Sequence, residues 1–108
     1  MDKRIADTIE RLQRSLGQLG IRAERIVLFG SHATGTADEH SDIDLAVISG
    51  DFGGLDMLQR LETVGVAFAR AGIMGPVEAL AYTPEEYHSR KRGTFVGDEV
   101  KAKGVAVL

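Results

Sequence analysis

A Gly-Ser pair and three acidic residues have types and spacing that suit chemistry on a phosphorylated ligand. The dipeptide Gly30-Ser31 directly follows the apolar segment 25–29. Glycine lets a backbone approach a ligand closely, and the free N–H groups of a turn, together with a serine hydroxyl, can hold phosphate oxygens. The pair therefore predicts a phosphate-binding turn at the end of a buried strand.

The acidic residues suit a divalent cation. Asp42 and Asp44 begin another apolar segment, and Glu78 lies inside a third. Alternate residues of a strand share a face, so the Asp42 and Asp44 side chains are expected roughly 6–7 Å apart. Mg²⁺ prefers carboxylate oxygens, with phosphates and water completing its octahedron. Two such ions can clamp an in-line displacement at phosphorus, one activating the attacking oxygen and the other stabilising the leaving diphosphate. Glu78 could bind the catalytic ion or accept the proton of an attacking hydroxyl.

These residues meet only if the strands that carry them lie side by side. Hydrophobic periodicity and turn residues indicate the elements. Thr83-Pro84 with Glu86 is a strong helix start, because it combines a cap, a first-position proline and a third-position glutamate. The predicted helices span 3–19, 55–71 and 95–103, with a single helical turn at 31–34 and a further helix beginning after Thr83. The predicted strands are 25–29, 42–48, 77–82 and 105–108. Segment 49–54 is a predicted turn or loop.

Each candidate residue also has a purely structural interpretation. Ser31 could be a helix N-cap, the two aspartates could be part of a solvated sheet face, and Glu78 could be an exposed strand position. Ten residues separate Gly30-Ser31 from Asp42. This combination and spacing favour the metal interpretation over the structural one. The three histidines lack the spacing of a zinc site, although His32 is a candidate phosphate contact.

The segment 30–47 resembles the signature of the minimal nucleotidyltransferases of the DNA polymerase β-like superfamily: Gly-Ser, ten residues, then Asp-x-Asp. The likeness extends less specifically to the order of elements along the whole chain. It implies an α/β (α+β) fold, a small mixed sheet flanked by helices. It also implies that Gly30 and Ser31 hold the triphosphate of ATP, while Asp42, Asp44 and Glu78 are catalytic and hold Mg²⁺, as two ions.

Many such minimal proteins are antitoxins that transfer AMP from ATP to a tyrosine of a HEPN-type toxin, and the resemblance implies this activity here. Two alternatives stay open: neutralisation of a partner by contact alone, and nucleotidyl transfer to a small molecule such as an aminoglycoside. The sequence departs from the family at His32 and Thr34, where arginine is common. Segment 31–50 contains no Lys or Arg, so charge for the nucleotide would come from Mg²⁺ or from elsewhere.

Composition narrows the class of protein further. The chain has 108 residues, 13 Lys+Arg against 16 Asp+Glu, and no Cys. One domain spanning 1–108 is expected, which would leave the acceptor site to a partner chain. The absence of cysteine excludes a disulfide framework, a zinc ribbon and a thiol nucleophile. The mild acidity gives no reason to expect nucleic-acid binding. Without a long apolar run or a signal peptide, a cytoplasmic location is the default expectation.

Overall fold

A computed structural model describes residues 3–38, 41–89, 100 and 103–108. The basic residues at 90–92 and most of the predicted helix at 95–103 lie outside the described residues. None of the helices within these ranges combines the length and apolar character needed to cross a bilayer.

The centre of the fold is a small mixed sheet. Its strands are β1 (Arg25–Phe29), β2 (Ile43–Ile48), β3 (Val77–Tyr82) and β4 (Val105–Ala106), in the spatial order β3-β2-β1-β4. β1 runs antiparallel to both β2 and β4, whereas β2 and β3 are parallel. The predicted fold class is thus confirmed, and strands 25–29 and 77–82 have the predicted bounds.

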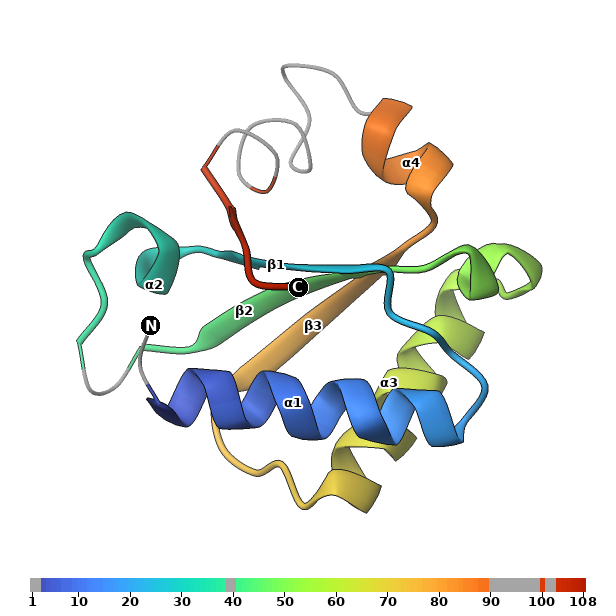
Figure 1. Cartoon of the computed structure of the whole chain (residues 1–108), viewed down its shortest axis with the longest axis horizontal. Helices are drawn as coiled ribbons and strands as arrows, with labels where there is room; N and C mark the ends of the chain where they lie inside the picture. Colours follow the sequence, from blue (N-terminus) through green and yellow to red (C-terminus); the bar gives the residue numbers. More distant parts are fainter. Residues whose placement is uncertain (1–2, 39–40, 90–99, 101–102) are drawn as a thin grey trace.

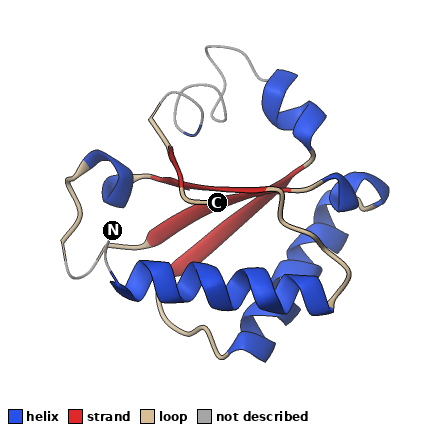
Figure 2. Cartoon of the chain, in the orientation of Figure 1, coloured by secondary structure: helices blue, strands red, loops and turns tan. Residues whose placement is uncertain are grey.

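Helices cover the two faces of this sheet unequally (Figures 1 and 2). The long helices α1 (Lys3–Gln18) and α3 (Met57–Ala71) lie on one face, and the short α4 (Pro84–Ser89) lies on the other. The single turn α2 (Ser31–Thr34) follows β1, as predicted. The predicted loop at 49–54 is instead mostly a 3₁₀ helix, η1 (Gly50–Gly54).

The core has a corresponding division into two clusters. The larger fills the space between the sheet and helices α1 and α3, and it includes Leu12, Leu16, Ile26, Leu45 and Val47. The smaller lies on the opposite face and contains Val27, Phe29, Ala46, Ile48, Tyr87 and Val100. Since successive strand residues point to opposite faces, Asp44 is expected on the face of Ala46 and Ile48.

Helix α3 shows where apolar spacing predicts a helix but not its buried side. Asp56 caps the helix, because its carboxylate accepts from the Gln59 N–H at 2.8 Å, and Gln59 returns the bond in a capping box. Leu58 and Leu61 keep the expected helical spacing but are 65% and 54% exposed. Arg60 is buried at 7% instead.

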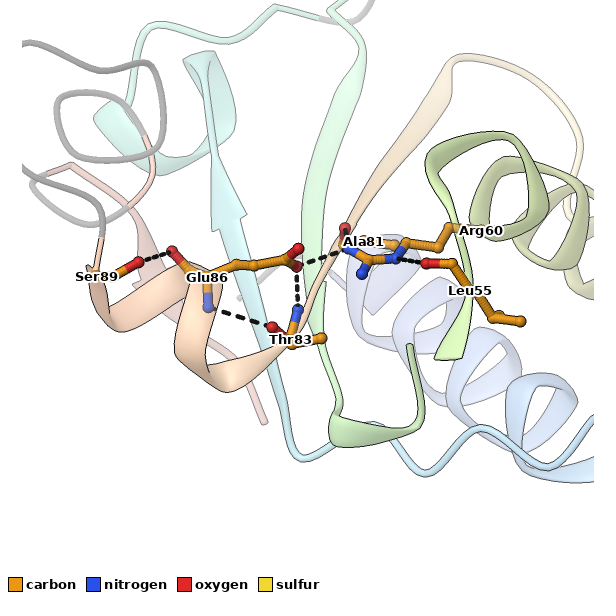
Figure 3. Close-up of polar contacts among 6 residues, drawn as sticks. All are labelled: Leu55, Arg60, Ala81, Thr83, Glu86 and Ser89. Carbon is orange, nitrogen blue, oxygen red and sulfur yellow. Dashed lines mark hydrogen bonds and ion pairs between the residues drawn. The ribbon is translucent and has the colours of Figure 1, made fainter. Parts of the chain in front are cut away.

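A polar network explains how Arg60 can be buried (Figure 3). Its guanidinium donates to Glu86 Oε1 at 2.6 Å, to the Ala81 carbonyl at 3.3 Å and to the Leu55 carbonyl at 3.1 Å. Glu86 Oε1 also accepts from the Thr83 N–H at 2.7 Å, within the predicted helix start. Arg60 therefore fastens α3 to the end of β3 and to the first turn of α4, and α4 in turn places Tyr87 over the second face.

Candidate functional site

The predicted site residues gather where β1 ends and β2 and β3 begin. Asp44 is the register partner of Phe29 on one side and of Glu78 on the other. The three side chains form a row across the sheet, on the face opposite α1 and α3. Asp42 lies one residue before β2 begins. The parallel pairing of β2 and β3 is what brings Glu78, 34 positions along the chain, next to Asp44.

Gly30 lies against the Asp44 carboxylate. Its backbone has φ 73° and ψ −155°, a region that glycine alone enters without strain. A Cβ at this position would lie 3.3 Å from Asp44 Cγ and would collide with Asp44 Oδ2. Both the backbone conformation and the available space therefore require glycine, and the close approach of this backbone to a ligand stays a prediction.

Ser31 is the first residue of α2 and not its cap. Gly30 holds the N-cap position, and no side chain makes a capping hydrogen bond there. The carbonyl of Gly30 accepts from the N–H groups of Ala33 and Thr34, at 3.1 and 3.2 Å. Gly35 ends the turn in a left-handed conformation. The structural alternative for Ser31 is therefore wrong, and its contact with a phosphate stays a prediction.

His32 links this turn to the start of β2. Its ring is partly buried, and Nε2 lies 3.4 Å from the carbonyl oxygen of Ser41, the residue before Asp42. Ser41 is itself held by Asp38, whose N–H donates to the Ser41 hydroxyl at 2.9 Å. Sequence reasoning missed this link, because it depends on how the chain returns after Gly35. A contact between His32 and phosphate stays a prediction.

The carboxylates are close enough to perturb one another. Burial raises the pKa of Asp44, and the negative charges of Glu78 and Asp42 raise it further. A hydrogen bond between the Asp44 and Glu78 carboxyls acts in the same direction, whereas the nearby His32 lowers this pKa. Asp44 is partly buried, while Asp42 and Glu78 are exposed. Asp44 and Glu78 thus lie within hydrogen-bonding reach of each other, beside the solvent-accessible Asp42.

The side chains of Asp42, Asp44 and Glu78 suit a hard divalent cation, because their potential ligand atoms are all carboxylate oxygens. Within the described ranges, no three Asp, Glu or His side chains converge closely enough to form a metal site on their own. Mg²⁺ at Asp42, Asp44 and Glu78 stays a prediction. Chemically, the arrangement offers a carboxylate pair for holding a cation or moving a proton, next to a backbone turn that can approach a phosphate.

Comparison with known proteins identifies a family for this chain. A family model described as a nucleotidyltransferase domain matches residues 9–95. The protein MJ1305 of Methanocaldococcus jannaschii, assigned as a protein adenylyltransferase, is 45% identical over 51 residues. That match covers 45% of this chain and 35% of MJ1305, so the chain spans about a third of this relative's length.

The fold of this chain was also compared with solved structures. A crystal structure of a protein from Sulfolobus solfataricus assigned as a nucleotidyltransferase matches with a TM-score of 0.56 and 20% identity, over 98% of this chain and 86% of that one. This likeness supports the fold alone. A crystal structure of a toxin–antitoxin with AMP-PNP gives a TM-score of 0.49 and 26% identity, over 76% of this chain and 59% of that chain. The family match covers most of the chain, including all five predicted site residues, and the chain belongs to the nucleotidyltransferase domain family.

Proposed function

We propose that this chain transfers AMP from ATP to a hydroxyl group of a partner protein, in a reaction that depends on Mg²⁺. The observation that carries the proposal is the Asp44–Glu78 pair lying beside the Gly30 turn. A carboxylate pair and a close backbone approach are the two parts that nucleotidyl transfer needs at one place. Asp42 extends the carboxylate set toward solvent.

Transfer of AMP exchanges one oxygen–phosphorus bond for another. The acceptor oxygen attacks the α-phosphorus of ATP, a new oxygen–phosphorus bond forms, and the bond to the bridging oxygen breaks to release diphosphate. The proton of the acceptor hydroxyl passes to Glu78, whose carboxylate is exposed. Gly30 and Ser31 hold the triphosphate with backbone N–H groups and the serine hydroxyl.

Mg²⁺ held by Asp42, Asp44 and Glu78 would neutralise triphosphate charge and polarise the phosphorus under attack. Segment 31–50 contributes no Lys or Arg to offset that charge. His32 is the nearest candidate for a positive group at the turn, and it lies on the Ser41 carbonyl.

A protein acceptor is supported by the name of MJ1305, a protein adenylyltransferase assignment on a relative with 45% identity over 51 residues. The sequence resemblance narrows the acceptor to a tyrosine of a HEPN-type toxin, which would make this chain an antitoxin. We therefore propose ATP as the nucleotide, a protein hydroxyl as the acceptor and an antitoxin role for this chain.

The test uses ATP labelled at the α-phosphate, Mg²⁺ and the product of the adjoining gene as acceptor. We expect the label to appear on that protein, with a mass gain in steps of one AMP. The double substitution Asp42→Asn/Asp44→Asn should abolish labelling, while Glu62→Gln, an exposed acid on α3, should leave it intact. Absence of labelling, or labelling that survives the double substitution, would contradict the proposal.

A second candidate function is neutralisation of the partner by contact alone. The lack of Lys and Arg in segment 31–50 favours it, because such a turn holds a nucleotide weakly without a cation. In a growth-rescue assay the double Asn variant would then still neutralise the partner, whereas loss of rescue supports catalysis.

A further inference from the structure

Asp42 is the predicted cation ligand with the least support from its own contacts. It lies outside β2, its side chain is exposed, and among the described residues that side chain makes no hydrogen bond or ion pair. Asp44 and Glu78, by contrast, are held within strands β2 and β3. The direction of the Asp42 carboxylate must therefore be set by the backbone on either side of it.

That backbone is held by the residues that flank Asp42. On one side Ile43 is buried, and its N–H donates to the Pro76 carbonyl at 2.7 Å. On the other side the Ser41 N–H donates to the Asp38 carbonyl at 3.2 Å, and the Ser41 hydroxyl accepts from the Asp38 N–H at 2.9 Å. The Ser41 carbonyl lies in the same peptide plane as the Asp42 N–H. A group that holds this carbonyl thus fixes one of the two peptide planes that meet at Asp42.

His32 holds that carbonyl from the neighbouring turn. The chain leaves α2, turns beyond the end of the sheet and returns into β2 (Figure 1). His32 Nε2 lies 3.4 Å from the Ser41 carbonyl oxygen, and the ring is partly buried. Ala33, the next residue of α2, packs against the larger core cluster, so the ring projects from a supported turn. The contact is long for a hydrogen bond, and such contacts in enzyme sites often tighten when substrate binds.

The contact also fixes which nitrogen of His32 carries a hydrogen. A carbonyl oxygen only accepts, so Nε2 is the donor, and Nδ1 of a neutral ring then has no hydrogen. A neutral His32 held in this way has no second N–H to offer a phosphate. The ring is also close enough to Asp44 to lower the pKa of that carboxyl, against the larger effects that raise it. The imidazole is thus near both aspartates of the predicted ligand set.

We propose that His32 is a positioning residue, which acts through the Ser41 carbonyl to hold Asp42 in the direction that a cation bound to the triphosphate requires. The inference rests on the proposed function and adds how a ligand outside the sheet is oriented. His32 directly follows Gly30-Ser31. One short turn therefore carries both the groups predicted to hold phosphate and the donor that holds the Asp42 peptide, and it keeps the two sites in a fixed relation.

Backbone order at Asp42 tests the inference without metal or nucleotide. From amide relaxation measured by NMR, we expect an order parameter of about 0.85 for the wild-type Asp42 amide, the value of rigid backbone. His32→Leu removes the donor and should lower this value to below about 0.6. His32→Gln, whose side-chain N–H reaches about as far as Nε2, should keep the wild-type value. Equal order in wild type and His32→Leu, or loss of order in both variants, overturns the proposal.

Calorimetric titration with ATP tests the consequence for the site. At pH 8 an unperturbed imidazole is neutral, so histidine charge does not enter the comparison. We expect His32→Leu to weaken ATP binding in Mg²⁺ about fivefold, as for one lost hydrogen bond, and to leave the weak binding in EDTA unchanged. His32→Gln should match wild type in both conditions. An equal loss in EDTA would show that the ring contacts the nucleotide itself, which overturns the positioning role.

A double-mutant cycle connects the effect to Asp42. If His32 acts through Asp42, adding His32→Leu to Asp42→Asn should cause no further loss of Mg²⁺-dependent ATP binding. Two independent contributions would instead multiply, and that result overturns the proposal. Melting temperatures of the variants identify any loss that comes from unfolding. If His32→Leu does not fold, His32→Asn takes its place, because its shorter amide stands where Nδ1 stood and does not reach the Ser41 carbonyl.

The two proposals fail in different ways. Backbone order and Mg²⁺-dependent binding can depend on His32 even if the wild-type chain labels no partner, and then the transfer reaction alone is rejected. Labelling that requires Asp42 but is the same in wild type and His32→Leu at limiting Mg²⁺ rejects the positioning role and leaves the proposed function intact.

Discussion

At the scale of single residues, the site depends most on the contact between Gly30 and Asp44. The glycine has no side chain where the aspartate carboxylate lies, and its φ of 73° is closed to other residues. Sequence reasoning found both residues from their types and spacing. It could not find that they touch, because the contact depends on the pairing of Phe29 with Asp44 across β1 and β2.

Replacing Gly30 with alanine should therefore disable the site. The added methyl group must displace the Asp44 carboxylate, and the backbone conformation costs about 1–3 kcal/mol for a non-glycine residue. We expect loss of AMP transfer and a lower melting temperature. Gly35→Ala is the matched control: it also has positive φ, 77°, but a Cβ there meets nothing within 4 Å. Gly35→Ala should lose stability and retain transfer; equal transfer in the two variants would contradict the steric argument.

Asp44→Asn should separate stability from activity. The pKa of Asp44 is raised by burial and by the nearby charges of Glu78 and Asp42, so the folded chain binds this proton more readily than the unfolded chain. Ionised Asp44 therefore destabilises the fold; the cost is fully present above the raised pKa and disappears as pH falls below the unfolded value. The amide should abolish transfer and raise the melting temperature by a few degrees at neutral pH.

The pH dependence provides the check on Asp44→Asn. Thermal melts of variant and wild type should converge on acidification, because wild-type Asp44 then becomes neutral. Glu62→Gln makes the same change of net charge at an exposed position and should shift the melting temperature little at any pH. A difference in melting temperature between variant and wild type that widens at low pH would show that ionised Asp44 does not destabilise the fold.

At the scale of elements, the strands were more predictable than the faces of the helices. Strand ends are marked by local residues such as Gly30 and Pro76, so the predicted strands 25–29 and 77–82 agree with β1 and β3. The side of a helix that is buried depends on distant elements. Arg60 is covered because Glu86, 26 positions away, lies within 2.6 Å, and helical periodicity alone carries no signal of that contact.

The Arg60–Glu86 contact should make α4 docking sensitive to acid. The hydrogen bond from Arg60 lowers the pKa of Glu86, so the pair stabilises the fold above the unfolded pKa and is lost as pH falls through the folded one. Glu86→Gln should cost roughly 1 kcal/mol at neutral pH, a modest value because solvent screens a partly exposed carboxylate. Urea titrations should show this cost shrinking on acidification. Glu85→Gln, the exposed neighbour in the same first turn, should cost little.

At the scale of the whole molecule, three acidic residues lie together at one end of the sheet. The chain carries a net charge of −3, and the predicted ligands Asp42, Asp44 and Glu78 are three of its acids. Without them the remaining acids and bases balance, 13 against 13. The equal number of remaining acids and bases follows from the composition alone, whereas the pairing of β2 with β3 is what brings these carboxylates together.

ATP binding should therefore depend strongly on the cation. Triphosphate and carboxylates repel each other when no metal lies between them. By isothermal titration calorimetry we expect ATP to bind with Mg²⁺ and to bind measurably but much more weakly with EDTA. Asp42→Asn should weaken Mg²⁺-dependent binding and strengthen metal-free binding, since it removes a like charge. Equal losses in both conditions would indicate that Asp42 acts on the fold and not on the cation.

The register between β2 and β3 has a consequence for refolding. A slip of one residue would turn Glu78 toward α1 and α3 and set Val77 or Ala79 next to Asp44, because neighbouring strand residues point to opposite faces. A misregistered molecule is then inactive, not merely slower. Recovery of activity after denaturation would count correctly paired molecules, and a population that regains secondary structure before activity would reveal mispaired chains awaiting correction.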